Sequence, residues 1–170
     1  MVKIIGLLLL VAAGTFLGYR AAAGLSRRAD SLDKAQRLLA HLASRMRYTA
    51  APVDELLAQA AATAEFAALP FLQAAARAAG TEEGFHAAWN EGVADYGKAC
   101  GFTESDLELL RSFGEGLGRT DLEGQLDNCR MYAAQLGDRL AEARREAAAK
   151  SRLYLTLGVT GGMALALLLL

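Results

Sequence analysis

The side chains that could do chemistry in this 170-residue sequence are few and scattered. Its two histidines, His41 and His86, belong neither to a His-Glu-x-x-His pattern nor to a set of Cys and His ligands. Its two cysteines, Cys100 and Cys129, stand 29 residues apart, which matches no metal-binding spacing. Cys129 falls on an apolar helix position, so we interpret it as a small buried hydrophobic residue.

A glycine-rich run, Gly114-Glu-Gly-Leu-Gly118, has a weak likeness to a phosphate-binding loop. No Lys-Ser/Thr pair follows it and no strand pattern precedes it, which argues against a nucleotide site. Trp89 is most simply a core residue, and an anchor for a partner protein is the alternative. The sequence therefore predicts no catalytic residue, no cofactor, no metal ion and no small-molecule substrate.

The composition indicates which elements carry these residues. Leu and Ala supply 66 residues, whereas the β-branched Ile and Val supply 7. Strong helix formers thus dominate over strand formers, and we expect an all-α protein. The net charge of −1 excludes a nucleic-acid binder that depends on an overall basic charge.

Hydrophobic residues make up 54% of the chain and are concentrated at its two ends. Ile4–Tyr19 and Leu153–Leu170 carry no charge, and their 16 and 18 residues as helices would reach roughly 24 and 27 Å. A bilayer core is about 30 Å thick, so we predict two transmembrane helices, the first lengthened by Ala21–Ala23. A cleaved signal peptide is the alternative for the first segment.

The predicted organisation is an N-terminal transmembrane segment with its flank (1–25), a helical bundle (26–152) and a C-terminal transmembrane segment (153–170). Basic residues gather just inside the two apolar ends: Arg20, Arg27, Arg28, Arg144, Arg145, Lys150 and Arg152. The positive-inside rule then places the bundle in the cytoplasm and both termini outside.

Each apolar end also carries small residues at helical spacing. The pairs are Gly14-x-x-x-Gly18 and Gly158-x-x-x-Gly162, with Gly161 beside the second pair. Such spacing lets two helices approach closely in lipid, although glycine is common in membrane helices in any case. We expect the two segments to pack on each other or on another membrane protein.

The middle of the chain shows helical periodicity throughout and predicts a bundle of about six helices. The first helix is expected to start near Ser31 and to end near Tyr48. Pro52 and Pro70 suit the first turns of the next two helices. Gly80 and Thr81 are expected to cap the ends that meet between the third and fourth helices.

Two capping boxes are predicted to open the last two helices, one at Thr103–Asp106 and one at Thr120–Glu123. The final helix carries an apolar heptad seam: Leu122, Leu126, Cys129, Ala133, Leu136, Leu140, Ala143 and Ala147. A repeated core face within the bundle explains this seam, and an intermolecular coiled coil is the alternative.

The sequence resembles the stage III sporulation protein AB family over nearly its whole length. The most specific likeness is the run from Phe113 to Gln125, which is similar to the family pattern F-G-x-x-L-G-x-[ST]-D-x-x-x-Q. The residues that match this pattern are Phe113, Gly114, Leu117, Gly118, Thr120, Asp121 and Gln125. Arg45 and Ala51 depart from the family, which often has an acidic residue and a threonine there.

The resemblance implies a non-enzymatic membrane platform in the channel-like complex that joins the mother cell to the forespore. Its helical domain is then similar to the cytoplasmic domains of the inner-membrane platform protein of type II secretion and type IV pilus systems. The implied location is the mother-cell membrane around the forespore. The implied partners are the bilayer, an ATPase similar to stage III sporulation protein AA, and other subunits of the complex.

The run Phe113–Gln125 is then either a contact for that ATPase or a structural turn between the last two helices. Two other functions stay open. The heptad seam and the glycine pairs would suit a self-associating membrane scaffold. The second alternative function is that of a membrane-bound signalling regulator.

Overall fold

The computed structural model describes residues 2–49, 51–78 and 82–168, and in this part of the chain every regular element is helical. The elements are α1 (Val2–Tyr48), α2 (Val53–Ala61), the 3₁₀ turn η1 (Ala64–Phe66), α3 (Pro70–Arg77), α4 (Glu82–Tyr96), α5 (Glu104–Gly116) and α6 (Leu122–Leu168). The all-α prediction is confirmed. The caps predicted at Gly80 and Thr81 lie outside the described residues.

The chain contacts divide into two compact units. Unit 1 consists of Met1–Ala29 and Glu142–Leu170, and unit 2 consists of Asp30–Ala141. Across the described ranges, no helix is both long enough and apolar enough to cross a membrane. The two transmembrane segments therefore stay predictions.

Helix α1 corrects one predicted boundary. The predicted start near Ser31 is wrong, because α1 is already helical from Val2 and ends at Tyr48 as expected. Ser31 is buried and does not cap a helix end. The residues before it are mostly Ala, Leu and Arg, whose high helix propensity continues the helix across this point.

The core of unit 2 contains an aromatic cluster at its centre. Trp89 of α4 is fully buried and meets the rings of Phe71 and Phe113 edge-on, with centroids 5.3 and 5.7 Å away. The Trp89 indole N–H donates to the carbonyl of Leu110 at 2.7 Å, so its polar atom is satisfied inside the core. The residue is therefore a core residue in this chain, as its spacing on the helix predicts.

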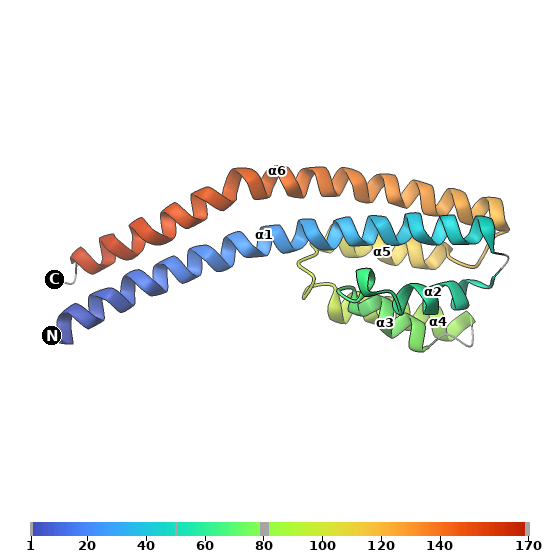
Figure 1. Ribbon diagram of the computed structural model, residues 1–170, viewed down its shortest axis with the longest axis horizontal. Coiled ribbons are helices and arrows are strands. Elements are labelled where there is room, and N and C mark those ends of the chain that lie inside the picture. Colours follow the sequence, from blue (N-terminus) through green and yellow to red (C-terminus); the bar gives the residue numbers. More distant parts are fainter. Residues whose placement is uncertain (1, 50, 79–81, 169–170) are drawn as a thin grey trace. The chain divides into compact units, whose positions relative to one another are not determined.

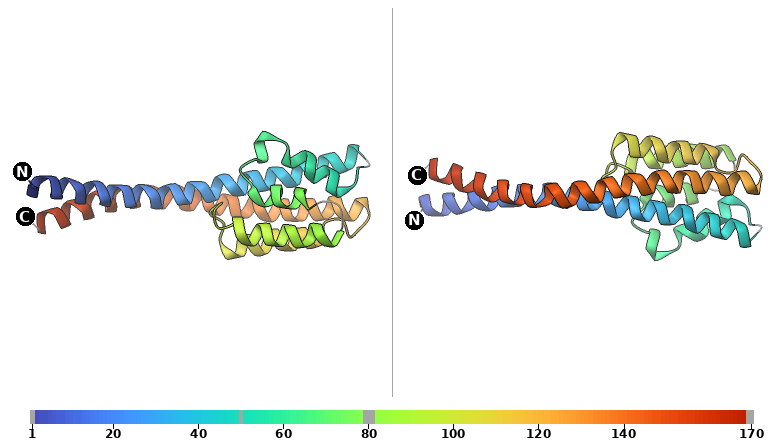
Figure 2. Two further views of the ribbon diagram at one scale, coloured as in Figure 1. Left: turned by 90° about the horizontal axis from the view of Figure 1, so that it is seen from below. Right: turned by 90° about the horizontal axis from the view of Figure 1, so that it is seen from above.

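Within unit 2, α3 packs on α2 and on α4, and α4 packs on α5. Figure 2 shows α2 beside the unit 2 part of α1 and α5 beside the unit 2 part of α6. Gly92 lets α4 approach α3, because a Cβ there would lie 3.1 Å from the Phe71 backbone. The close approach brings the aromatic rings of α3 and α4 into contact.

The heptad seam of α6 is largely buried within this chain. Leu126, Cys129, Leu136 and Leu140 are between 1 and 5% exposed in unit 2, which confirms the core-face interpretation for them. The first seam position is wrong, because Leu122 is 52% exposed. Leu122 is the first residue of α6.

In unit 1, the first part of α1 and the last part of α6 lie side by side and antiparallel, with both ends of the chain at the same end (Figure 1). Arg28 of α1 pairs with Glu146 of α6 at 3.5 Å, and Glu146 also accepts from Lys150 at 2.6 Å. The hydrogen bond and charge of Lys150 lower the pKa of the Glu146 carboxyl, and Glu146 in turn raises the pKa of Lys150.

The outer surface of unit 1 is unusually apolar for a protein in water. More than half of the Phe16, Leu17, Leu157 and Leu167 side chains is exposed. Thr15, Thr156 and Thr160 each donate their hydroxyl to the carbonyl four residues earlier. This bond satisfies a hydroxyl locally and leaves an apolar exterior.

We predict that glycine at position 158 is required for the helix pairing of unit 1, whereas glycine at 161 is not. A Cβ on Gly158 would lie 2.6 Å from the Gly14 carbonyl oxygen, but one on Gly161 meets nothing within 4 Å. Gly158→Leu should lengthen the separation of spin labels at exposed positions 9 and 167 by several ångströms, while Gly161→Leu should leave it unchanged. Equal distances in both variants would contradict the pairing.

Candidate functional site: the turn between α5 and α6

Gln125 holds the turn between α5 and α6 together from inside. Its side-chain oxygen accepts the backbone N–H of Gly118 at 2.9 Å. Its amide nitrogen donates to the Gly116 carbonyl at 3.1 Å and to the Thr120 hydroxyl at 2.8 Å. Only 5% of Gln125 is exposed, so this amide is a buried bridge across the turn.

The chain reverses at Gly118, where the backbone enters the left-handed region with a φ of +83°. A residue with a Cβ is strained there, which explains a glycine at this position of the turn. Leu117, immediately before it, is fully buried and fixes the end of α5 in the core. The turn is thus anchored by one apolar side chain and one buried amide.

The cap of α6 differs by one residue from the predicted capping box. The prediction that Thr120 caps the helix is wrong, because Asp121 accepts the N–H of Gly124 at 3.0 Å in that role. Thr120 instead accepts from Gln125, and Glu123 is not part of a box. The box predicted at Thr103–Asp106 is confirmed, with both of its hydrogen bonds present.

Phe113 and Gly114 form the inner edge of the site. Phe113 is fully buried, and its ring meets Tyr132 of α6 edge-on with centroids 5.8 Å apart. Gly114 lies against the Trp89 indole so closely that a Cβ would overlap the ring. Both residues therefore serve the packing of α4, α5 and α6.

The outward face of the turn is what a partner could touch. Gly118, Thr120 and Asp121 are exposed, whereas the other members of the predicted set are buried: Phe113, Gly114, Leu117 and Gln125. The structure thus brings all seven residues together in one turn but separates them into an inner and an outer layer.

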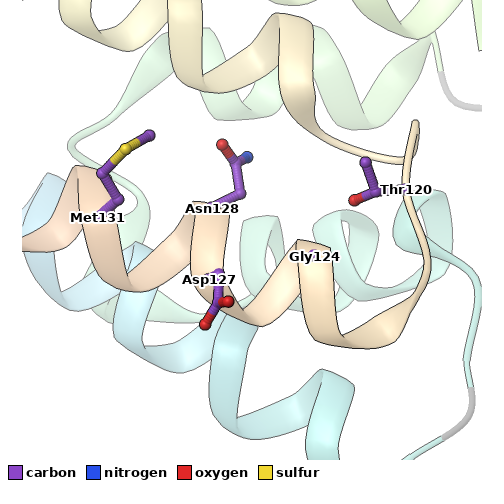
Figure 3. Close-up of a pocket in the computed structure, with 5 residues that line it drawn as sticks. All are labelled: Thr120, Gly124, Asp127, Asn128 and Met131. Carbon is purple, nitrogen blue, oxygen red and sulfur yellow. The ribbon is translucent and has the colours of Figure 1, made fainter.

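A surface hollow of about 330 Å³ opens beside this outer layer. It is lined by Thr120, Gly124, Asp127, Asn128 and Met131 (Figure 3). In Figure 3 the Asn128 and Met131 side chains point toward α5 across the hollow. Asn128 and Met131 do not belong to the predicted set. Asn128 donates to the Phe113 carbonyl at 3.4 Å, and Met131 is 50% exposed beside a buried seam.

The second predicted set comprises the glycines of unit 1. Gly14 faces Gly158 and Gly162, and Gly18 faces the backbone of Tyr154 and Gly158. Gly161 stands apart from this crossing. These contacts lie between two parts of one chain within unit 1, and packing of the two segments inside a membrane stays a prediction.

The cysteines and histidines do not form a reactive cluster in the described ranges. Both cysteines are buried and neither forms a disulfide bond, and burial raises the pKa of the Cys129 thiol to about 11. Both ring nitrogens of His86 are buried without a hydrogen-bond partner. No three His, Cys, Asp or Glu side chains among the described residues are placed to hold a metal ion.

We predict that Gln125→Ala lowers the free energy of unfolding by about 2–3 kcal/mol, because it leaves buried backbone groups of the turn unpaired. Urea denaturation of the full chain followed by circular dichroism measures this loss. Gln135→Ala is the matched control on the same helix, since Gln135 is exposed. Equal stability of the two variants would show that the amide bridge is not required.

We also predict a loss of stability in alkali that depends on Cys129. The folded thiol has a raised pKa of about 11 against an ordinary value of 9.0, so the unfolded chain loses its proton first. The stabilising contribution is complete below pH 9 and disappears as the pH rises to about 11, a loss of roughly 2–3 kcal/mol. Denaturation curves across this range should be steeper in pH for the natural chain than for Cys129→Ala, and parallel slopes would refute the effect.

The sequence model of one family, described as stage III sporulation protein AB, matches residues 3–170. No curated protein and no solved structure matches the chain. The family match covers nearly the whole chain, including the turn from Phe113 to Gln125 and both glycine pairs. The chain therefore belongs to the stage III sporulation protein AB family.

Proposed function

We propose that this stage III sporulation protein is a non-enzymatic, membrane-anchored platform in the complex between mother cell and forespore. Unit 1 anchors it in the mother-cell membrane, and unit 2 docks a cytoplasmic ATPase similar to stage III sporulation protein AA. The bundle then lies in the cytoplasm and both termini lie outside.

The observation that carries the anchoring is the surface of unit 1. Its inward contacts are made by glycine backbones and its outward positions by large apolar side chains, including Leu9 at 65% and Leu17 at 68% exposed. Exposed apolar surface of this extent is costly in water and is usual where a protein meets lipid or another apolar surface. The pairing leaves each backbone bonded within its own helix, as an apolar surrounding requires.

The platform role is supported by the contrast between the inner and outer layers of the α5–α6 turn. The buried layer maintains a fixed turn, and the exposed layer offers mixed polar and apolar chemistry suited to a protein partner. Asp121 and Leu122 stand on this layer, and Met131 lies beside it at the hollow. We assign the ATPase contact to this outer layer.

The self-associating scaffold loses its two arguments. The heptad seam is buried in its own chain at Leu126, Cys129, Leu136 and Leu140, and the glycine pairs of unit 1 contact each other. Neither pattern is available to a second copy without opening a unit. No specific observation favours the signalling regulator.

We predict that the full-length protein captures the ATPase from the membranes of sporulating cells and that the outer layer is required. Asp121→Asn keeps a good helix cap but removes a charge, and Leu122→Glu replaces an exposed apolar side chain. The double variant should lose most of the captured ATPase, measured by affinity purification and immunoblotting.

Gln135→Lys serves as the control, because it changes the charge of an exposed residue of the same helix away from the turn. It should capture the ATPase as the natural chain does. Undiminished capture by the double variant, with normal denaturation behaviour, would reject docking at the turn.

A further inference from the structure

The two units carry opposite net charges. Unit 1 contains eight basic and two acidic residues, a net charge of +6, whereas unit 2 contains ten basic and seventeen acidic residues, a net charge of −7. The net charge of −1 for the whole chain hides this separation. Seven of the eight basic residues of unit 1 fall within 20–29 and 142–152. We call these seven the basic collar: Arg20, Arg27, Arg28, Arg144, Arg145, Lys150 and Arg152.

Basic residues of the collar outnumber the carboxylates of unit 1. The two carboxylates of unit 1 are Glu142 and Glu146, and Glu146 is shared by Arg28 and Lys150. Arg20, Arg27 and Arg152 are exposed, and Arg20 lies over the Phe16 ring at 5.9 Å. Seven basic groups against two carboxylates leave this part of unit 1 with a net positive charge, and the three exposed arginines present it at the surface.

The collar adjoins the uncharged part of unit 1 at a sharp border. Beyond Arg20 toward the N-terminus and beyond Arg152 toward the C-terminus, the described residues carry no charge except Lys3. Tyr19, 61% exposed, and Tyr154 stand at this border on the two helices. Tyrosine rings are enriched at the level of lipid headgroups, with an apolar side toward the hydrocarbon and a hydroxyl toward water.

The spacing of the collar matches the depth of the headgroup region. Arg20 and Arg152 lie at the border itself, and the most distant members, Arg28 and Arg144, lie eight residues from them along α1 and α6, roughly 12 Å at the helical rise. The headgroup layer and the Debye length at physiological salt together extend over about the same distance. All seven basic groups are therefore within electrostatic reach of the phosphates of a single leaflet.

We propose that the basic collar binds the headgroups of anionic phospholipids and enriches them around unit 1. This inference rests on the proposed seating of unit 1 in a membrane and adds the lipid class that the site selects. The ligand is the phosphate of an anionic lipid rather than of nucleic acid. The collar is continuous with an apolar, uncharged surface, and the net charge of −1 for the whole chain disfavours a long polyanion as the ligand.

The test is the lipid retained by the full-length protein after reconstitution into vesicles of equal phosphatidylcholine and phosphatidylglycerol. The vesicles are washed at alkaline pH to confirm insertion and then dissolved in mild detergent. The protein is captured, and the ratio of the two lipids bound to it is compared with the ratio in the vesicles. We expect enrichment of phosphatidylglycerol that falls at high salt.

The variant Arg20→Gln, Arg27→Gln and Arg152→Gln removes three exposed charges of the collar and none of the Arg28–Glu146–Lys150 group. One basic group near a charged surface changes lipid affinity about fivefold, so this variant should lose most of the enrichment. The control variant Arg45→Gln, Arg47→Gln and Arg119→Gln removes three exposed charges from unit 2 and should keep the enrichment.

The outcomes separate this inference from the proposed function. Insertion of the natural chain without enrichment would overturn the inference and leave the anchoring intact, whereas release by the alkaline wash would overturn the anchoring itself. Enrichment that survives in the collar variant would show that the collar is not the site. Duplex DNA that displaces phosphatidylglycerol from the natural chain would mark a general polyanion surface and also overturn the lipid assignment.

Discussion

The contact between the Trp89 indole and the bare backbone of Gly114 is the constraint on which unit 2 depends. Because Gly114 has no side chain, α5 comes close enough for the indole N–H to reach the Leu110 carbonyl. The same position brings the indole into T-shaped contact with the rings of Phe113 and Phe71. Trp89 thus connects α3, α4 and α5. This packing fixes the position of α5 and therefore of the turn that follows it.

Glycines also allow a close backbone approach in unit 1. There the glycines bring two helix backbones together without any large side chain between them, and the apolar side chains turn outward. In unit 2 glycine makes room for an aromatic core, whereas in unit 1 it takes the place of a core. The difference follows from what each unit buries: rings in one case, backbone against backbone in the other.

The sequence predicts the elements better than the hydrogen bonds that join them. The helical class, the ends at Tyr48 and Pro70, and the Thr103 capping box follow from propensity and local chemistry, which act over a few residues. The cap at Asp121 in place of Thr120 does not follow from local chemistry, because both side chains are good caps. The Thr120 hydroxyl instead accepts a hydrogen bond from Gln125, five residues later in the chain. A helix start is predicted near Ser31 because serine is a common N-cap, but the strong helix formers before it continue α1 without a break.

The antiparallel pairing in unit 1 has a consequence for the order of folding. Its two halves are separated in the chain by the whole of Asp30–Ala141, so their contacts are among the least local in the protein. Closing so long a connection is slow while unit 2 is unfolded. Within folded unit 2, the Gln36 side chain of α1 donates to the Ala133 carbonyl of α6 at 3.2 Å, so these parts of the two helices are already joined. During synthesis Gly14 and Gly18 are made more than a hundred residues before Tyr154 and Gly158, so their own partners in this chain are absent until synthesis reaches those residues.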